Sequence, residues 1–133
     1  MSFATADDLA GIPLFEALER DARATIAPWF EVQEAGPGVK LTGEGAAGYS
    51  FFVLREGSAT VTINGIEVRT LGPGDFFGEL AILSEGRRTA TVTTGAPSQM
   101  LVLFGTEFRR LQQAYPELAA QIESRLRETA QAA

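Results

Sequence analysis

The residues best suited to chemistry in this chain lie between Gly72 and Val92, where glycines, a carboxylate and a guanidinium occur close together. Gly78 has no Cβ, so a ligand can approach the backbone closely, and residues 79–83 are rich in helix formers. A short helix beginning here would point unpaired N–H groups at an anion and favour it by about 0.3–1 kcal/mol. Because Arg88 can return over the same point and add about 1.5–3 kcal/mol, the stretch predicts a phosphate site.

Glu79 indicates what kind of molecule carries the phosphate. Its carboxylate directly follows the expected anion position and would repel a bare phosphate. The same carboxylate is well suited to accept hydrogen bonds from a hydroxyl group, so the carrier should bear a hydroxyl, as a ribose does. A surface ion pair between Glu79 and Arg88 around a loop is the alternative that these two residues alone would allow.

The order of residues from Phe77 to Val92 resembles the phosphate-binding cassette of the cyclic nucleotide-binding domain family. That family occurs in bacterial catabolite-type regulators, regulatory subunits of cyclic-nucleotide-dependent kinases and gated channels. Its cassette usually reads Phe-Gly-Glu-Leu-Ala-Leu, several variable residues, and then Arg-Thr/Ser/Ala-Ala-Thr-Val. This chain has Ile82 where leucine is common, and Arg87 where the family often has proline, which makes the tip of the cassette less rigid.

The resemblance also implies a role for each matching residue. Gly78 and Glu79 would hold the ribose 2′-hydroxyl and the edge of the cyclic phosphate, and the next two residues would offer backbone N–H groups. Arg88 would pair with the exocyclic phosphate oxygens, and Thr89 would add a hydroxyl. The predicted ligand site comprises Gly78, Glu79, Leu80, Ala81, Arg88, Thr89 and Ala90.

Composition excludes several other classes of protein. The 133 residues contain no histidine and no cysteine, so disulfides, a histidine-bound metal and Ser–His or Cys–His nucleophiles are ruled out. The net charge of −6 repels nucleic acid and anionic lipid. No run of about eighteen apolar residues and no secretion signal is present, so we expect a cytoplasmic protein without direct membrane insertion. We also expect no enzymatic activity, no metal and no cofactor other than the ligand itself.

A helical lead-in is expected over residues 5–28. Thr5 and Asp8 have the spacing of a capping box, and apolar residues follow around Pro13. A second short helix is expected from Glu19 to Ala27. Trp29 and Phe30 are interpreted as core aromatics, with nucleotide stacking by Trp29 as the less favoured alternative.

From residue 29 to 104 short apolar runs separated by glycine predict the strands of an antiparallel barrel or jelly roll. The fold class is therefore α+β, mainly β: an antiparallel β-roll, like a jelly-roll barrel, with N-terminal helices and two C-terminal helices in one domain over residues 1–133. The expected strands are Phe30–Ala35, Val39–Thr42, Tyr49–Arg55, Ser58–Ile63, Ile66–Leu71, Arg88–Thr94 and Gln99–Phe104.

Turn signals and apolar side chains refine the picture of the roll. Asn64-Gly65 predicts a hairpin with a type I′ turn, and Gly36-Pro37-Gly38 and Gly72-Pro73-Gly74 are interpreted as equivalent turns. An apolar wall for a purine could come from strands carrying Val61, Ile63, Val68 and Leu71, although core packing is the default for each. Phe51, Phe52, Phe76 and Phe77 are likewise expected in the core.

Two helices are expected over residues 106–131, the first with Thr106 as N-cap and the second beginning at Pro116. The second carries an apolar stripe of Leu118, Ala119, Ile122 and Leu126. The resemblance implies that these helices move when nucleotide binds. The candidate base lid is Ile122, Leu126 or Arg125. The alternatives are that the stripe docks on the barrel or forms a homodimer with a second copy.

The leading hypothesis is a sensor of a 3′,5′-cyclic purine nucleotide that acts through an effector protein or domain of unknown identity. We favour cAMP, while Thr89 also permits cGMP by the family resemblance. A ligand-free interaction module that dimerises through the C-terminal helix is the alternative of a different class.

Overall fold

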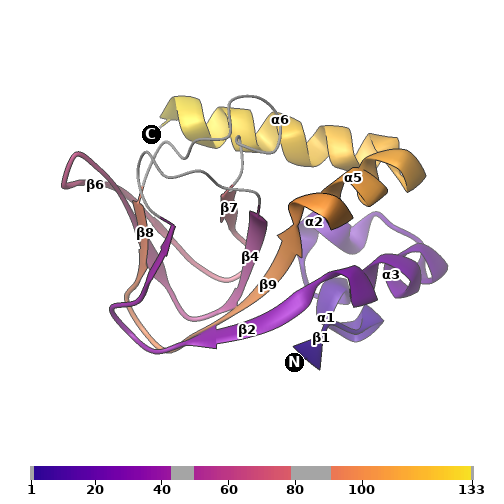
Figure 1. The fold of residues 1–133 in the computed structure, drawn as a ribbon, viewed down its shortest axis with the longest axis horizontal. Helices are drawn as coiled ribbons and strands as arrows, with labels where there is room; N and C mark the ends of the chain where they lie inside the picture. Colours follow the sequence, from indigo (N-terminus) through magenta and orange to yellow (C-terminus); the bar gives the residue numbers. More distant parts are fainter. Residues whose placement is uncertain (1, 43–49, 79–90, 133) are drawn as a thin grey trace.

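The computed structural model describes residues 2–42, 50–78 and 91–132 of the chain. Its strands form two antiparallel sheets that pack against each other as a roll, which confirms the predicted fold class. Figure 1 shows four helices grouped on one side of the sheets, α1 (Ala6–Ala10), α2 (Pro13–Glu16), α3 (Arg20–Ile26) and α5 (Gly105–Ala114). The last helix, α6 (Pro116–Ala132), extends from this group across the strands. None of the helices within these ranges is long and apolar enough to cross a bilayer.

The predicted helical lead-in forms three short α-helices and one 3₁₀ turn. These are α1 (Ala6–Ala10), α2 (Pro13–Glu16), α3 (Arg20–Ile26) and η1 (Ala27–Trp29). The predicted capping box is present, because the Thr5 hydroxyl accepts from the Asp8 amide and the Asp8 carboxylate accepts from the Thr5 amide at 2.7 Å. The other oxygen of Asp8 lies 2.7 Å from Nη1 of Arg55, which joins α1 to the sheet.

Replacing Asp8 should therefore cost more than an ordinary surface substitution. Asp8→Ala removes both a helix cap and an ion pair, and should lower the free energy of unfolding by about 1–2 kcal/mol. Asp7→Ala is the matched control, since Asp7 is exposed in the same first turn, and should change stability by less than about 0.5 kcal/mol. Urea denaturation measures both values. Equal losses in the two variants would show that the cap and the ion pair contribute nothing.

The two sheets account for every predicted strand and add two more. The five-stranded sheet contains, in spatial order, β1 (Ser2–Phe3), β2 (Glu31–Ala35), β9 (Ser98–Phe104), β4 (Ser50–Glu56) and β7 (Phe76–Gly78). The four-stranded sheet contains β3 (Lys40–Thr42), β8 (Thr91–Thr94), β5 (Ala59–Ile63) and β6 (Ile66–Leu71). The strands expected from the sequence do not include β1 or β7, although the Gly72-Pro73-Gly74 turn indicates a strand after it. The expected strand residues Tyr49 and 88–90 lie outside the described residues.

The predicted turns are confirmed by backbone geometry. Asn64 and Gly65 have φ values of 52° and 78°, as a type I′ turn between β5 and β6 requires. Gly38 and Gly74 have φ values of 79° and 92°, each directly after a proline. Glycine adopts this left-handed conformation at low cost, so the two Gly-Pro-Gly segments make equivalent turns into β3 and β7.

The apolar side chains divide into two core clusters. The first lies between the five-stranded sheet and the helices, and it includes Phe15, Phe30 and Phe51, none of which is exposed to solvent. The second lies between the two sheets and includes Phe52 and Phe77. Phe76 packs against the first cluster while half-buried, so the expected core roles of all these phenylalanines are confirmed.

The chain ends in α5 (Gly105–Ala114) and α6 (Pro116–Ala132), which meet at Tyr115. The predicted start at Pro116 is confirmed, but the assignment of Thr106 as N-cap is wrong. Phe104 occupies the cap position without a side-chain hydrogen bond, and the helix begins at Gly105. The reason is that β9 passes directly into α5 with no intervening loop, so Thr106 already lies inside the first turn.

Candidate functional site

Gly78 is the one member of the predicted ligand site that the structure describes. It ends β7 and pairs with Phe51 of β4. Thr91, where the description resumes, begins β8 of the other sheet and pairs with Thr62. The chain between Gly78 and Thr91 therefore connects the two sheets. The remaining predicted ligand residues, which are Glu79, Leu80, Ala81, Arg88, Thr89 and Ala90, lie outside the described residues.

The turn before β7 holds this strand in place. The Asp75 carboxylate accepts from the Gly72 amide at 2.8 Å, which closes the turn on itself. Leu54 of β4 donates its amide to the Asp75 carbonyl and accepts from the Gly74 amide, both at 2.8 Å. These bonds fix β7, the edge strand of the five-stranded sheet, to its neighbour β4, only three residues before Gly78.

Two aromatic pairs hold the opposite faces of β7. The rings of Phe52 and Phe77 stack in parallel with centroids 4.9 Å apart, inside the cluster between the sheets. On the other face, Phe51 and Phe76 meet at 5.5 Å and an angle of 52°. Such pairs add about 0.5–1.5 kcal/mol each beyond the area they bury. Gly78 therefore ends a strand that aromatic contacts hold on both faces.

The inner wall of the roll differs from the expected one at β6. Val61 and Leu71 are buried in the cluster between the sheets, in keeping with their core reading, whereas Val68 is 37% exposed. Counting back from the Asn64-Gly65 turn places Val68 opposite Val61, but a register shift between Val61 and Thr62 pairs Val61 with Arg69 instead. The bulge thus turns Val68 outward and Arg69 toward the face that Val61 shares.

Arg69 is consequently a candidate site residue that the sequence analysis missed. Its side chain is half-buried, on the same face of β6 as Leu71, and no hydrogen bond or ion pair joins it to another described residue. A guanidinium in this position has donors available for a polar ligand inside the roll. The alternation of inward and outward side chains along β6 predicts an inward Arg69 only when the bulge is taken into account.

The C-terminal helix lies beside the strand that carries Gly78. Helix α6 contacts β7, and its Leu118, Ala119 and Ile122 are buried in the first core cluster. The described part of the apolar stripe therefore docks on the chain's own barrel. Ile122, with no exposed surface, packs against that core, while the side chains of the other candidate lid residues, Arg125 and Leu126, lie outside the described residues.

Trp29 sits away from the roll interior, against the start of the C-terminal helices. The Arg110 guanidinium lies over the Trp29 ring, 4.5 Å from the ring centroid, and the centroids of the Trp29 and Tyr115 rings are 6.4 Å apart. Trp29 is half-buried against the first core cluster. This placement supports the core reading of Trp29 and makes it a neighbour of both α5 and the α5–α6 junction.

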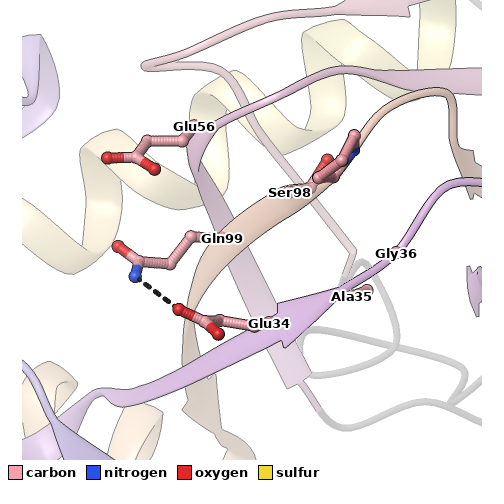
Figure 2. Close-up of a pocket in the computed structure, with 7 residues that line it drawn as sticks. Glu34, Ala35, Gly36, Glu56, Ser98 and Gln99 are labelled. Atoms are coloured by element: carbon pink, nitrogen blue, oxygen red, sulfur yellow. Dashed lines mark hydrogen bonds between the residues drawn. The ribbon is translucent and has the colours of Figure 1, made fainter.

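A separate shallow cavity of about 410 Å³ opens where β2, β4 and β9 lie side by side. Figure 2 shows Glu34 and Gln99 directed toward each other, with the Gln99 amide donating to the Glu34 carboxylate at 3.2 Å. The Gln99 carbonyl oxygen in turn accepts from Arg55 at 2.9 Å. Because two of the lining side chains, Glu34 and Glu56, are carboxylates and the Gln99 amide already donates to one of them, this cavity is unsuited to a phosphate. Among the described residues, no three acidic side chains gather closely enough to hold a metal ion.

Comparisons with known proteins identify the family. The model of the family described as "Cyclic nucleotide-binding domain" matches residues 32–115. Among curated proteins, the chain is 39% identical over 85 residues to a cGMP-dependent protein kinase of Toxoplasma gondii, covering 64% of this chain and 9% of that protein. It is 36% identical over 107 residues to a cAMP-dependent protein kinase regulatory subunit of Colletotrichum orbiculare, covering 79% of this chain and 27% of the relative.

Solved structures agree with these matches. A cAMP-bound PfPKA-R structure superposes with a TM-score of 0.83 at 27% identity, covering 95% of this chain and 43% of that one. The Thermus thermophilus catabolite activator protein gives a TM-score of 0.75 at 27% identity, with coverage of 88% and 59%. The chain spans well under a third of the two curated relatives, and what it matches in them is the binding domain. The chain belongs to the cyclic nucleotide-binding domain family, and it is similar to parts of cAMP- and cGMP-dependent kinase proteins.

Proposed function

We propose that this chain senses cAMP, binding it with the cassette from Gly78 to Ala90 and passing the signal to an effector through α5 and α6. The observation that carries the proposal is the position of Gly78, at the end of a braced strand that α6 contacts. A cyclic phosphate held at this point would touch the roll and lie next to the helix that must respond. Solved structures with the same fold at 26–27% identity include complexes with cAMP and with the analogue Sp-2Cl-cAMPS, which supports cAMP as the first ligand to test.

The response we propose is a shift of α5 and α6 about Tyr115, which breaks the helical path with φ of −136° and ψ of 67°. In the present arrangement α6 buries Ile122 in the core, so any other arrangement gives up that packing. The nucleotide can favour a second arrangement only by binding it more tightly than the first. Contacts from Arg125 or Leu126 to the base would supply such a difference.

The single tryptophan offers a direct test of this movement. Because Trp29 contacts Arg110 of α5 and lies near Tyr115, a shift of the helices should change its emission. Titration with cAMP, excited at the red edge of tryptophan absorption, should give a saturable change, while 5′-AMP, which lacks the cyclic phosphate, should give none. The contrary result would be that calorimetry detects cAMP binding while Trp29 emission and hydrogen exchange in α5 and α6 stay constant. That result would support binding of cAMP and rule out the proposed movement of the helices.

A cGMP sensor is the second candidate, and Arg69 favours it. Arginine donates two parallel hydrogen bonds to O6 and N7 of guanine, whereas adenine presents a donor where guanine has O6. A purine that entered the roll beside Val61 would meet the half-buried Arg69 guanidinium. The kinase of Toxoplasma gondii, 39% identical over the matched region, is cGMP-dependent.

Replacing Arg69 separates the two ligands. If Arg69 reads the base, Arg69→Ala should weaken cGMP by about fivefold or more relative to cAMP, since a bidentate contact discriminates by about 1–3 kcal/mol. Arg109→Ala is the matched control, because Arg109 is an exposed arginine on α5 and its loss changes the net charge equally. Competition binding with both nucleotides measures the ratio. An Arg69→Ala variant with an unchanged cGMP-to-cAMP ratio would remove this residue from base recognition.

A further inference from the structure

A second concave surface lies where β1, η1, β2 and α5 meet, formed by none of the cassette residues. It encloses about 380 Å³, enough for one or two side chains of a partner. We term it the aromatic pocket and define it by the residues that matter to its chemistry, which are Phe3, Trp29, Phe104, Glu31, Glu107 and Arg110.

Two exposed phenylalanine side chains line the aromatic pocket beside its charged groups. Phe3 is 53% exposed and Phe104 is 41% exposed, and both belong to the few large apolar side chains that the described residues leave in contact with water. The register places Phe3 opposite Glu31 and Glu31 opposite Val102, so Phe3 and Phe104 share one face of the sheet. Trp29 adds the edge of a half-buried ring. Clustered exposed aromatics of this kind mark interaction surfaces.

The charges around the aromatic pocket select the occupant. Its two carboxylates, Glu31 and Glu107, face a single cation, Arg110. That cation is already engaged, because its guanidinium lies over Trp29 and its Nη1 is 3.7 Å from the Glu107 carboxylate. The rim is thus net negative, on a chain whose net charge is −6. An anionic partner is repelled, and a second copy of the chain brings six further negative charges.

We propose that the aromatic pocket docks an extended segment of a partner protein in which an apolar side chain is flanked by lysine or arginine. The apolar side chain enters between Phe3 and Phe104, and the flanking cation meets Glu31 and Glu107. A cation can also exchange with Arg110 over the Trp29 ring, since guanidinium and ammonium groups are both attracted to indole. This docking requires no nucleotide, so a test of it is independent of the proposed sensor function.

Selection from a phage-displayed library of random dodecapeptides on the immobilised intact chain tests the proposal. Enriched sequences should combine an aromatic or aliphatic residue with neighbouring Lys or Arg. The most enriched peptide, synthesised and titrated, should alter Trp29 emission from within the pocket. The double variant Phe3→Ser/Phe104→Ser should bind it at least about tenfold more weakly, because apolar anchors dominate such interfaces. Glu31→Gln/Glu107→Gln should weaken it by about threefold or more, with a smaller dependence on salt.

Matched controls keep the outcome decisive. Ile66→Ser removes a 67% exposed apolar side chain from the β5–β6 hairpin, and Glu16→Gln/Glu19→Gln removes two exposed carboxylates near α2. Both controls should bind the peptide as the unsubstituted chain does, and circular dichroism should show that every variant is folded. Peptides that bind the Phe3→Ser/Phe104→Ser variant equally well, selection of acidic sequences, or a dimer in sedimentation that this variant disrupts would each overturn the proposal.

Discussion

An Arg88→Ala variant should bind cyclic nucleotide at least about tenfold more weakly than the unsubstituted chain. The reason is that a charge-assisted hydrogen bond to phosphate contributes about 1.5–3 kcal/mol, and 1.4 kcal/mol corresponds to a factor of ten in affinity. The loss should be larger than this minimum because the negative charge of the whole chain gives the anion no other long-range attraction. Equilibrium titration with cAMP and with cGMP measures the effect for both candidate ligands.

The neighbouring arginine provides the matched control. Arg87→Ala changes the net charge by the same amount one residue earlier, at a position where the family resemblance assigns no ligand contact. Its affinity should stay within about threefold of the original, as expected for a general electrostatic effect. Equal losses at positions 87 and 88 would mean that the cassette attracts phosphate as a diffuse basic patch, and the specific role of Arg88 would be wrong.

The largest expected loss of stability is at Phe30. Its side chain has no exposed surface and meets the Phe15 ring edge-on, with centroids 5.6 Å apart and planes at 76°. Phe30→Ala removes this contact and leaves a cavity between the lead-in helices and the sheet, so the free energy of unfolding should fall by about 3–5 kcal/mol. Urea denaturation measures the loss.

Phe3→Ala is the corresponding control at the surface. Phe3 is 53% exposed in β1, so truncating it should cost less than about 1 kcal/mol. Similar losses for Phe3→Ala and Phe30→Ala would show that the lead-in does not share a packed core with the sheet. A large loss at Phe30 alone supports a packed core shared by the lead-in helices and the five-stranded sheet.

Features set by neighbouring residues could be predicted from the sequence. Asn64-Gly65 specifies a type I′ turn because both positions need positive φ, and the Thr5–Asp8 spacing specifies a capping box; both are present. Pro116 begins α6 for a similarly local reason, since its missing N–H is not needed in the first turn. These local signals were sufficient to predict that a β-roll lies in the sequence between N-terminal and C-terminal helices.

Features that depend on residues distant in the sequence could not be predicted. The two-residue strand β1 and the three-residue strand β7 are too short for alternation to indicate them, and pairing with β2 and β4 decides their conformation. The bulge opposite Val61 arises from the way β5 and β6 pair. The sequence therefore gives no signal that Arg69, and not Val68, lies on the inner face. Gly78 could be assigned to the predicted ligand site from the residues next to it in the sequence. Which residue covers the base depends instead on how α6 packs, and this packing has no local sequence signal.

Calorimetric titration of the unsubstituted chain and of Glu79→Ala with cAMP tests the central claim most directly. A sugar ring held by its phosphate and its 2′-hydroxyl predicts a saturable heat with one nucleotide per chain, and a markedly weaker affinity when the Glu79 carboxylate is absent. The absence of any heat with cAMP and with cGMP up to millimolar concentration would contradict the account.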